Sequence, residues 1–272
     1  MLDHLIKKIL TKNLKLKNKY KNQTCYILGN GASLKNYDLK FLKDENIITC
    51  NWMLLHEDFK HLKKIIGYVE LTPFYFFPFL RNPYTRKMEI NYVKKLFNEN
   101  YKNFDFPLFA SVTNLFFLDR NKTFFLHDFR DKKINFNNYK IDQKFPLMKG
   151  AFYSMLGIAK YMGFNKIYLV GLDYWMSEPI TGHFYEKKIY DVENNNYLKT
   201  VKHKVDFPFI NQVNKELDVT MICPKKYSSN LFKSINYSKF FQTNENIKRN
   251  DEIVSMKNLQ ALSKLGWKFK IF

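Results

Sequence analysis

The stretch Tyr26-Ile-Leu-Gly-Asn-Gly-Ala-Ser-Leu34 is an apolar run that ends in an asparagine with a glycine on each side. The two glycines allow the backbone to turn sharply after a strand, so that main-chain N–H groups can approach a bound anion closely. Asn30 adds a neutral donor and acceptor, and Ser33 follows in the same turn. The pattern predicts a strand that ends in a phosphate cradle, although strand exits without a ligand also use such turns.

Outward from this stretch, apolar runs typical of buried parallel strands alternate with helical patterns. The predicted strands are residues 24–28, 47–50, 65–69, 107–112, 123–126, 166–170 and 219–223. The predicted helices are residues 39–44, 87–101, 151–162, 209–217 and 253–265. This alternation predicts an α/β fold, a Rossmann-like doubly wound and mostly parallel sheet with helices on both faces.

Ligands of such sheets bind beyond the carboxyl ends of the strands, at the switch in strand order. The residues that follow the predicted strands are therefore candidates for a binding site. They are Gly29, Asn30 and Gly31 after the first strand, Asn51 after the second, and Asp173, Tyr174 and Trp175 after the sixth. Asp173, at the end of a buried strand, is expected to accept backbone N–H bonds and shape the next loop rather than hold a metal.

The 272 residues carry a formal net charge of +20, which favours anionic partners. The excess comes from 40 Lys and only five Arg, and the chain also holds 29 Asn. Specific readers of bases and phosphates favour the planar guanidinium of arginine, so this composition argues against nucleic acid as the partner. A non-catalytic nucleic-acid-binding protein stays an alternative.

The three cysteines lie in apolar runs without paired or Cys-x-x-Cys spacing, which predicts a reduced, cytoplasmic setting. No apolar run approaches the roughly 18 residues that span a bilayer, and no signal peptide is visible at the N-terminus. We expect a cytoplasmic protein, with peripheral contact at the inner face of the membrane as an option. No Asp-x-Asp motif is present, so neither a metal nor another cofactor is expected.

Three segments are expected along the chain. Residues 1–22 have apolar residues at helical spacing with lysines between them. They predict either a terminal helix packed on the domain or a basic amphipathic helix on an anionic membrane or a partner. Residues 23–174 and 207–272 form the nucleotide-binding domain. Residues 175–206 lack a pattern and predict a lid over the active site.

With these pieces assembled, the chain resembles the bacterial lipooligosaccharide sialyltransferases of glycosyltransferase family 42. The matching stretches are residues 27–34, 49–51, 150–155, 161–175 and 219–224, in the family's order. The resemblance implies a GT-A-like variant of the Rossmann fold and a membrane-associated enzyme of lipooligosaccharide or capsule synthesis. It further implies metal-independent transfer of a nonulosonic acid, with inversion, from a CMP-activated donor to a glycan or glycolipid, and a homo-oligomer.

The same resemblance assigns roles residue by residue. Asn30 and Asn51 match asparagines that contact the donor, and Gly150 matches a glycine at a helix start beside it. Trp175 replaces a tyrosine that binds the leaving phosphate, a role that Tyr174 could take over, with Tyr185 as a further donor.

Lys149 stands where the family has a serine, which leaves room for a sugar other than ordinary sialic acid. His203, between two lysines, is placed closest to the catalytic base. His183 is the competing candidate, or it occupies the place of a second phosphate-binding tyrosine.

A second resemblance points to different chemistry on the same fold. The chain is similar to polysaccharide-cluster proteins related to MptE-like diphosphokinases, which share the Gly-Asn-Gly entry, Asn51 and a Gly-x-Asp followed by His-Phe. Such an enzyme would need ATP and Mg²⁺, and the chain lacks a Walker-type lysine and clustered carboxylates. ATP-dependent diphosphokinase activity is thus the other enzymatic alternative.

Overall fold

The computed structural model describes residues 2–76, 95, 106–130, 135–147, 150–180, 182–186 and 206–264. These residues form a nine-stranded sheet with the order β6-β5-β4-β3-β2-β1-β7-β8-β9, in which every pair of neighbours is parallel. The strands are β1 (Thr24–Leu28), β2 (Ile47–Cys50), β3 (Ile65–Glu70), β4 (Leu108–Ser111), β5 (Thr123–Arg130), β6 (Lys144–Leu147), β7 (Lys166–Val170), β8 (Asp218–Cys223) and β9 (Lys233–Asn236). The predicted α/β, doubly wound parallel sheet is confirmed.

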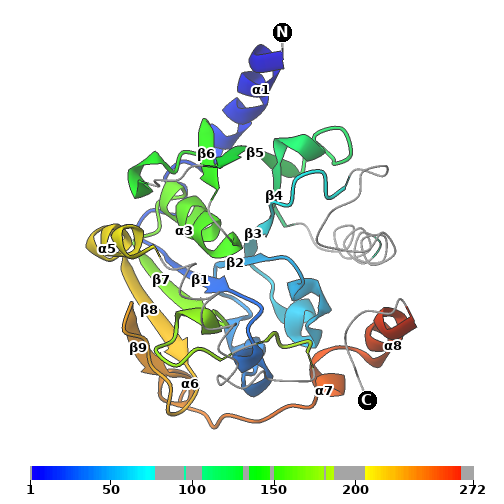
Figure 1. Cartoon of the computed structure of the whole chain (residues 1–272), viewed down its shortest axis with the longest axis vertical. Helices are drawn as coiled ribbons and strands as arrows, with labels where there is room; N and C mark the ends of the chain where they lie inside the picture. Colours follow the sequence, from blue (N-terminus) through cyan, green and yellow to red (C-terminus); the bar gives the residue numbers. More distant parts are fainter. Residues whose placement is uncertain are drawn as a thin grey trace.

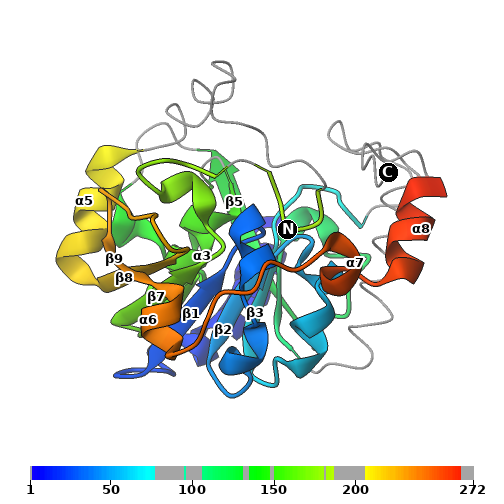
Figure 2. The ribbon, with the colours of Figure 1, turned by 90° about the horizontal axis from the view of Figure 1, so that it is seen from below.

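Helices cover both faces of this sheet (Figures 1 and 2). The α-helices are α1 (Leu2–Thr11), α3 (Ala151–Tyr161), α5 (Phe207–Glu216), α6 (Tyr237–Phe241), α7 (Asn250–Ile253) and α8 (Met256–Lys264). The 3-10 helices are η1 (Lys12–Leu16), η2 (Ala32–Asn36), η3 (Leu39–Leu42), η4 (Met53–Leu55), η5 (Glu57–His61), η6 (Val112–Asn114), η7 (Phe136–Asn138) and η8 (Asp173–Trp175). One apolar layer contains α3 and α5, and the other contains η2 to η5 with α6 and α7.

The seven central strands lie within a few residues of their predicted bounds, because each is a buried apolar run. The two edge strands were not predicted. β6 contains Pro146, which removes a backbone donor and is tolerated at an edge, and β9 is mostly polar, with two exposed and two half-buried residues. The helix expected at residues 39–44 is the 3-10 helix η3, and the one expected at 253–265 is divided into α7 and α8. The helix expected at 87–101 lies outside the described residues, apart from Lys95.

The strand order has its switch between β1 and β7. The chain adds strands outward from β1 to β6, and α3 then returns it to β7 on the other side of β1. The carboxyl ends of these two strands are joined directly, because the Gly29 N–H donates to Val170 O and the Gly31 N–H to Gly171 O, both at 2.8 Å. This is the place where sheets of this type bind their ligands.

The N-terminal segment is fastened to the sheet at its second half. Asn13 in η1 is fully buried, and its side-chain amide donates to Phe125 O at 2.8 Å and to Ile141 O at 2.5 Å. Helix α1, which precedes it, contacts β5 and projects from the body of the molecule (Figure 1). None of the helices in the described ranges is long and apolar enough to cross a membrane.

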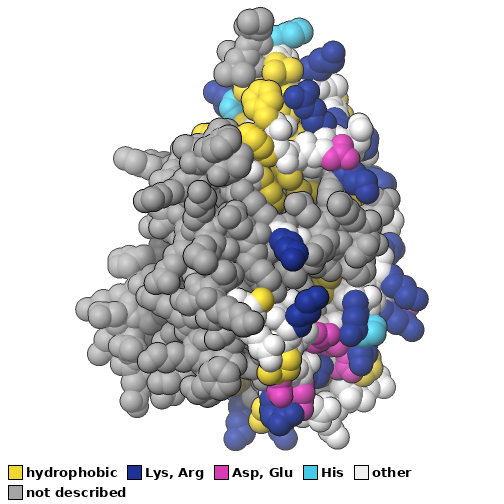
Figure 3. All heavy atoms as spheres, turned by 90° about the vertical axis from the view of Figure 1, so that its right-hand side faces the viewer, with side chains coloured by type: hydrophobic (Ala, Val, Ile, Leu, Met, Phe, Trp, Pro, Cys, Tyr) yellow, Lys and Arg dark blue, Asp and Glu magenta, His cyan; other side chains and the backbone are white. Residues whose placement is uncertain are grey.

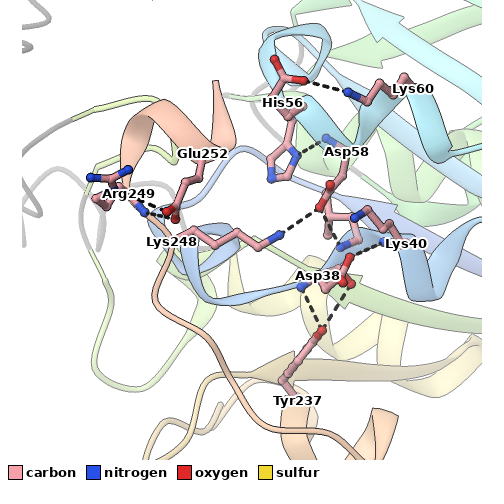
Figure 4. A network of polar contacts seen from close by, with 11 residues as sticks. Asp38, Lys40, His56, Asp58, Lys60, Tyr237, Lys248, Arg249 and Glu252 are labelled. Carbon is pink, nitrogen blue, oxygen red and sulfur yellow. Dashed lines mark hydrogen bonds and ion pairs between the residues drawn. The ribbon is translucent and has the colours of Figure 1, made fainter. Parts of the chain in front are cut away.

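The C-terminal segment is held by a polar network on the face opposite α3 (Figure 4). The Lys248 ammonium lies 3.2 Å from the Asp58 carboxylate, and the Asp58 N–H donates to His56 Nδ1 at 3.1 Å. Complete burial lowers the pKa of His56 to about 4, so its ring is neutral at physiological pH. The ring meets Phe184 edge-on, with centroids 5.0 Å apart, and in this way the network supports the loop that carries His183.

Candidate functional site

The two glycines of the β1 exit serve close packing against the β7 exit. A Cβ on Gly29 would lie 2.3 Å from Gly171 O, and one on Gly31 would lie 2.4 Å from Asp173 Cγ. Because both glycine N–H groups donate to carbonyls of the β7 exit, neither is available to a phosphate. The Gly29 and Gly31 N–H groups are therefore not part of the predicted phosphate cradle, and the glycines shape the site by allowing the two exits to touch.

Asp173 locks the turn that follows Gly31. Its Oδ2 accepts the Ser33 N–H at 2.7 Å, and its Oδ1 accepts the Ser33 hydroxyl at 2.5 Å. Burial raises the pKa of Asp173 to about 6, although the bonds from Ser33 oppose this shift. Both residues are 1% exposed, and Asp173 accepts a backbone N–H as expected, so the pair holds the turn in place.

Replacing Asp173 by asparagine should change how stability depends on pH. The raised pKa means that Asp173 stabilises the folded chain fully below about pH 4, and that this contribution is lost as the pH rises through 6. Asparagine does not titrate, so Asp173→Asn should not lose this stability. Between about pH 4 and pH 6, the free energy of unfolding of the variant should rise by roughly 3 kcal/mol relative to that of the unmodified protein. Urea unfolding curves across this range measure the difference, and curves that stay parallel would contradict the assignment.

The asparagines of the site make different contacts. Asn30 is 9% exposed, and its Nδ2 donates to Cys50 O at 3.2 Å. Its Oδ1 is buried without a hydrogen-bond partner among the residues that the structure describes. Asn51 follows β2 with φ of 53°, a left-handed conformation that asparagine tolerates better than most residues. A buried acceptor thus lies at the switch point, beside a second asparagine at the next strand end.

The loop that carries His183 is bound to the turn around Asn30. Gly31 and His183 form an antiparallel bridge, and the Phe184 N–H donates to Asn30 O at 3.1 Å. The Glu186 carboxylate contacts His183 at two points, a hydrogen bond from the backbone and a close approach to the ring, whose buried Nδ1 makes no hydrogen bond to the described residues. Its Oε2 accepts the His183 N–H at 2.9 Å, and its Oε1 lies 3.2 Å from the ring Nδ1.

Lys35 completes this arrangement from η2. Its ammonium, on a residue that is 8% exposed, donates to the Glu186 carbonyl oxygen. Burial alone would raise the pKa of Glu186, but the His183 side chain and then the Lys35 charge hold it below its usual value. Glu186 is therefore an anion at neutral pH, and it pairs with a histidine whose side chain is 34% exposed.

The aromatic candidates occupy two environments. The Tyr185 ring stacks on the His183 ring with centroids 4.9 Å apart and planes at 3°, and the half-buried Tyr174 ring meets the same imidazole edge-on at 6.5 Å. Burial, with Glu186 and Asp173 nearby, raises the pKa of Tyr174 to about 12. Trp175 instead packs in the core beside Phe152 at 4.6 Å, so the structure does not bring it to the His183 loop.

Gly150 precedes α3, and two other candidates lie outside the described residues. Gly150 has φ of 102°, is exposed, and gives α3 no side-chain cap. The first N–H groups of α3 have no partner within the helix, which makes its N-terminus favourable for an anion. Lys149 and His203 are both outside the described residues, as are residue 181 and residues 187–205 of the expected lid.

Sequence reasoning missed Glu186 and Lys35. The signal for Glu186 was its position three residues after His183, where a carboxylate can reach an imidazole across one turn. Lys35 had no local signal, because the partner of its ammonium is 151 residues away along the chain. Within the described ranges, no group of three or more His, Cys, Asp or Glu could hold a metal ion.

No protein-family model and no curated protein matches the sequence. The chain is similar to solved sialyltransferases of Campylobacter jejuni. One is CstII in complex with the substrate analogue CMP-3FNeuAc, at 19% identity and a TM-score of 0.44, covering 90% of this chain and 100% of that one. Another is the monofunctional alpha-2,3-sialyltransferase Cst-I, at 19% identity and a TM-score of 0.42, covering 92% and 96%. At this sequence identity and TM-score, the likeness does not show the activity of this chain. The contacts within the site are the basis for a proposal.

Proposed function

We propose that the protein is a glycosyltransferase that moves a sugar from a CMP-activated donor to a hydroxyl of a glycan or glycolipid, with inversion. The observation that carries the proposal is the meeting, at the strand switch, of a buried acceptor on Asn30 with the His183–Glu186 pair. The first can recognise a nucleoside and the second can remove a proton. The choice of CMP and of a nonulosonic acid follows the sequence resemblance.

Asn30 is suited to the nucleoside part of the donor rather than to its phosphate. Its amide Nδ2 donates to Cys50 O at 3.2 Å and contacts Cys50 Sγ at 4.0 Å, so the unpartnered atom is Oδ1, which can only accept a hydrogen bond. A phosphate has no N–H to offer, whereas a ribose hydroxyl or the amino group of cytosine does have a proton to donate. A ligand that leaves this oxygen unpaired would lose affinity, which gives the site selectivity.

The phosphate would take its hydrogen bonds from groups around the β7 exit. The raised pKa of Tyr174 keeps its phenol protonated at neutral pH, so that it can donate. The N-terminal N–H groups of α3 are a second source, because the first turn of α3 packs on Trp175 next to that exit. Lys149 and Tyr185 are further candidates. These neutral and cationic donors would stabilise the leaving phosphate without a metal.

In the proposed reaction His183 is the general base. Its Nε2 takes the proton of the acceptor hydroxyl while the oxygen forms a bond to the anomeric carbon. The bond between that carbon and the phosphate oxygen breaks, and its electron pair leaves with CMP. The Glu186 carboxylate, 3.2 Å from Nδ1, would stabilise the positive charge that develops on the ring, as the carboxylate of a catalytic triad does. His203 is the alternative base.

Replacing Asn30 by alanine tests recognition of the nucleotide. Isothermal titration of the unmodified protein should show CMP binding without Mg²⁺, and Asn30→Ala should weaken it about tenfold, the value of one hydrogen bond in a buried site. Asn165→Ala, an exposed asparagine at the amino end of β7, is the matched control and should bind CMP normally.

The titration also separates the alternatives. Binding of ATP that requires Mg²⁺, in the absence of CMP binding, would move the protein to the diphosphokinase class. Tight binding of random oligonucleotides that falls steeply with salt would support a nucleic-acid-binding protein instead. Equal CMP affinity of the Asn30 and Asn165 variants would remove Asn30 from the site.

A further inference from the structure

The N-terminal segment is a helix with separate apolar and basic side chains that covers little of the protein. In α1, Leu10 is buried, whereas Leu5, Ile6 and Ile9 are only half-buried. Exposed lysines follow throughout the segment, at positions 7, 8, 15, 17, 19 and 21. No acidic residue occurs between His4 and Tyr37. Among the described residues this helix contacts β5, and it leaves part of its apolar side exposed, with lysines on its polar side.

A second group of exposed apolar side chains lies in the turn between β4 and β5, which is hydrogen-bonded to the N-terminal segment. The Lys12 ammonium donates to Asn121 O at 2.7 Å and to Arg120 O, in the turn between β4 and β5. This turn presents Phe116, which is 73% exposed, with the Arg120 guanidinium 6.0 Å from its ring centroid. Leu14, two residues after Lys12, is 46% exposed. Figure 3 shows hydrophobic side chains gathered at the α1 end of the molecule with lysines around them.

We propose that α1 and this turn form a docking face for an anionic phospholipid bilayer. The N-terminal docking face comprises Leu5, Ile6, Ile9, Leu14 and Phe116 as apolar contacts, and Lys7, Lys8, Lys15 and Arg120 as cations. The apolar side chains enter the boundary between headgroups and acyl chains, and the cations meet the lipid phosphates. Lysines with long apolar stems suit this interface, because the stem lies along the apolar surface and the ammonium stays in water.

Charge selects this occupant over a second copy of the chain. Two copies placed face to face would bring the four cations of the face against the same four, and Asp119 is the only acidic residue among residues 4–37 and the β4–β5 turn. An anionic bilayer supplies the opposite charge, and each lysine near its surface strengthens binding about fivefold. The docking face lies at the β5 end of the sheet, so a bilayer bound there leaves the β1–β7 switch uncovered (Figure 1).

Sedimentation with vesicles tests the proposal on the full chain. The protein should bind vesicles made of equal parts phosphatidylglycerol and phosphatidylcholine, and not vesicles of phosphatidylcholine alone. The double variant Lys7→Gln/Lys8→Gln should bind the anionic vesicles roughly 30-fold more weakly. Ile6→Ser should lower binding roughly tenfold through the lost apolar contact. High salt should weaken binding by screening.

The matched control removes two exposed lysines at another place. Lys40 and Lys43 lie in and beside η3, where they line a hollow of about 540 Å³ with Lys60 and Lys63. Lys40→Gln/Lys43→Gln should keep vesicle binding within about twofold.

Equal losses in the two double variants would overturn the proposal, because net charge alone would then decide binding. Concentration-dependent dimers that Ile6→Ser dissociates would assign the face to a second copy. CMP titration of each variant keeps this test independent of the proposed activity, since all of them should bind CMP like the unmodified protein.

Discussion

A His183→Asn protein should lose about 10²- to 10⁴-fold in kcat, the usual contribution of a general base, while it binds CMP with unchanged affinity. The loop should keep its place, because the bridge to Gly31 and the bond from the His183 N–H to Glu186 use the backbone. The side chain alone supplies the proton acceptor. Initial rates with a CMP-sugar donor, together with titration of CMP, separate the two effects.

Glu186→Gln is the companion variant that tests positioning. Glutamine keeps the shape of the side chain but removes the negative charge that stabilises the protonated ring. The maximal rate should therefore fall about tenfold or more, while the KM for the donor stays unchanged. A purely structural role for Glu186 would raise the KM for the donor as well as lower the rate.

His61→Asn is the matched control, because His61 lies in η5 at the hollow lined by Lys40 and Lys63, away from the strand switch. It should retain full activity. If His203→Asn abolishes turnover and His183→Asn does not, the base is His203, and His183 then serves the phosphate or the loop.

Gly29→Ala should cost about 3 kcal/mol of unfolding free energy, the upper range for overpacking a core. The added methyl would lie 2.3 Å from Gly171 O, a backbone atom that cannot rotate away, and 2.6 Å from Leu172 Cδ2. The two strand exits would have to separate, and the bond from the Gly29 N–H to Val170 O would be strained. Urea unfolding followed by circular dichroism measures the loss.

Gly67→Ala provides the comparison for this variant. Gly67 is also a strand glycine, but its added Cβ would approach only side-chain atoms, the Phe109 ring at 3.0 Å and Ile48 Cγ1 at 3.5 Å, and side chains can yield. We expect a loss of about 1 kcal/mol there. Losses of equal size in the two variants would contradict our inference that the close contact between the β1 and β7 exits requires a glycine at position 29. If Gly29→Ala yields no folded protein while Gly67→Ala does, the claim is supported.

The sequence alone predicted the central strands because their signal is local. A buried parallel strand is a continuous apolar run, and seven such runs stand out between polar turns. The edge strands β6 and β9 carry no such run, because one side of each is unpaired and accepts proline or polar residues. The expected lid and the choice between His203 and His183 stay predictions, since residues 187–205 are not described.

In the candidate site, too, the sequence predicted which residues lie at the strand ends, and the tertiary structure determined their contacts. Its members Asn30, Asn51 and Asp173 were predicted from the rule that ligands collect at strand ends, which needs only the strands themselves. The tertiary structure decided what each can do. It paired the glycine N–H groups with β7, bound both oxygens of Asp173 to Ser33, and left Asn30 with an acceptor alone. The third outcome depends on a bond between Asn30 and Cys50, which are 20 residues apart, and the first two on contacts between segments about 140 residues apart. Such contacts exist only after the strand order has placed β7 beside β1, and no local pattern of residues encodes that order.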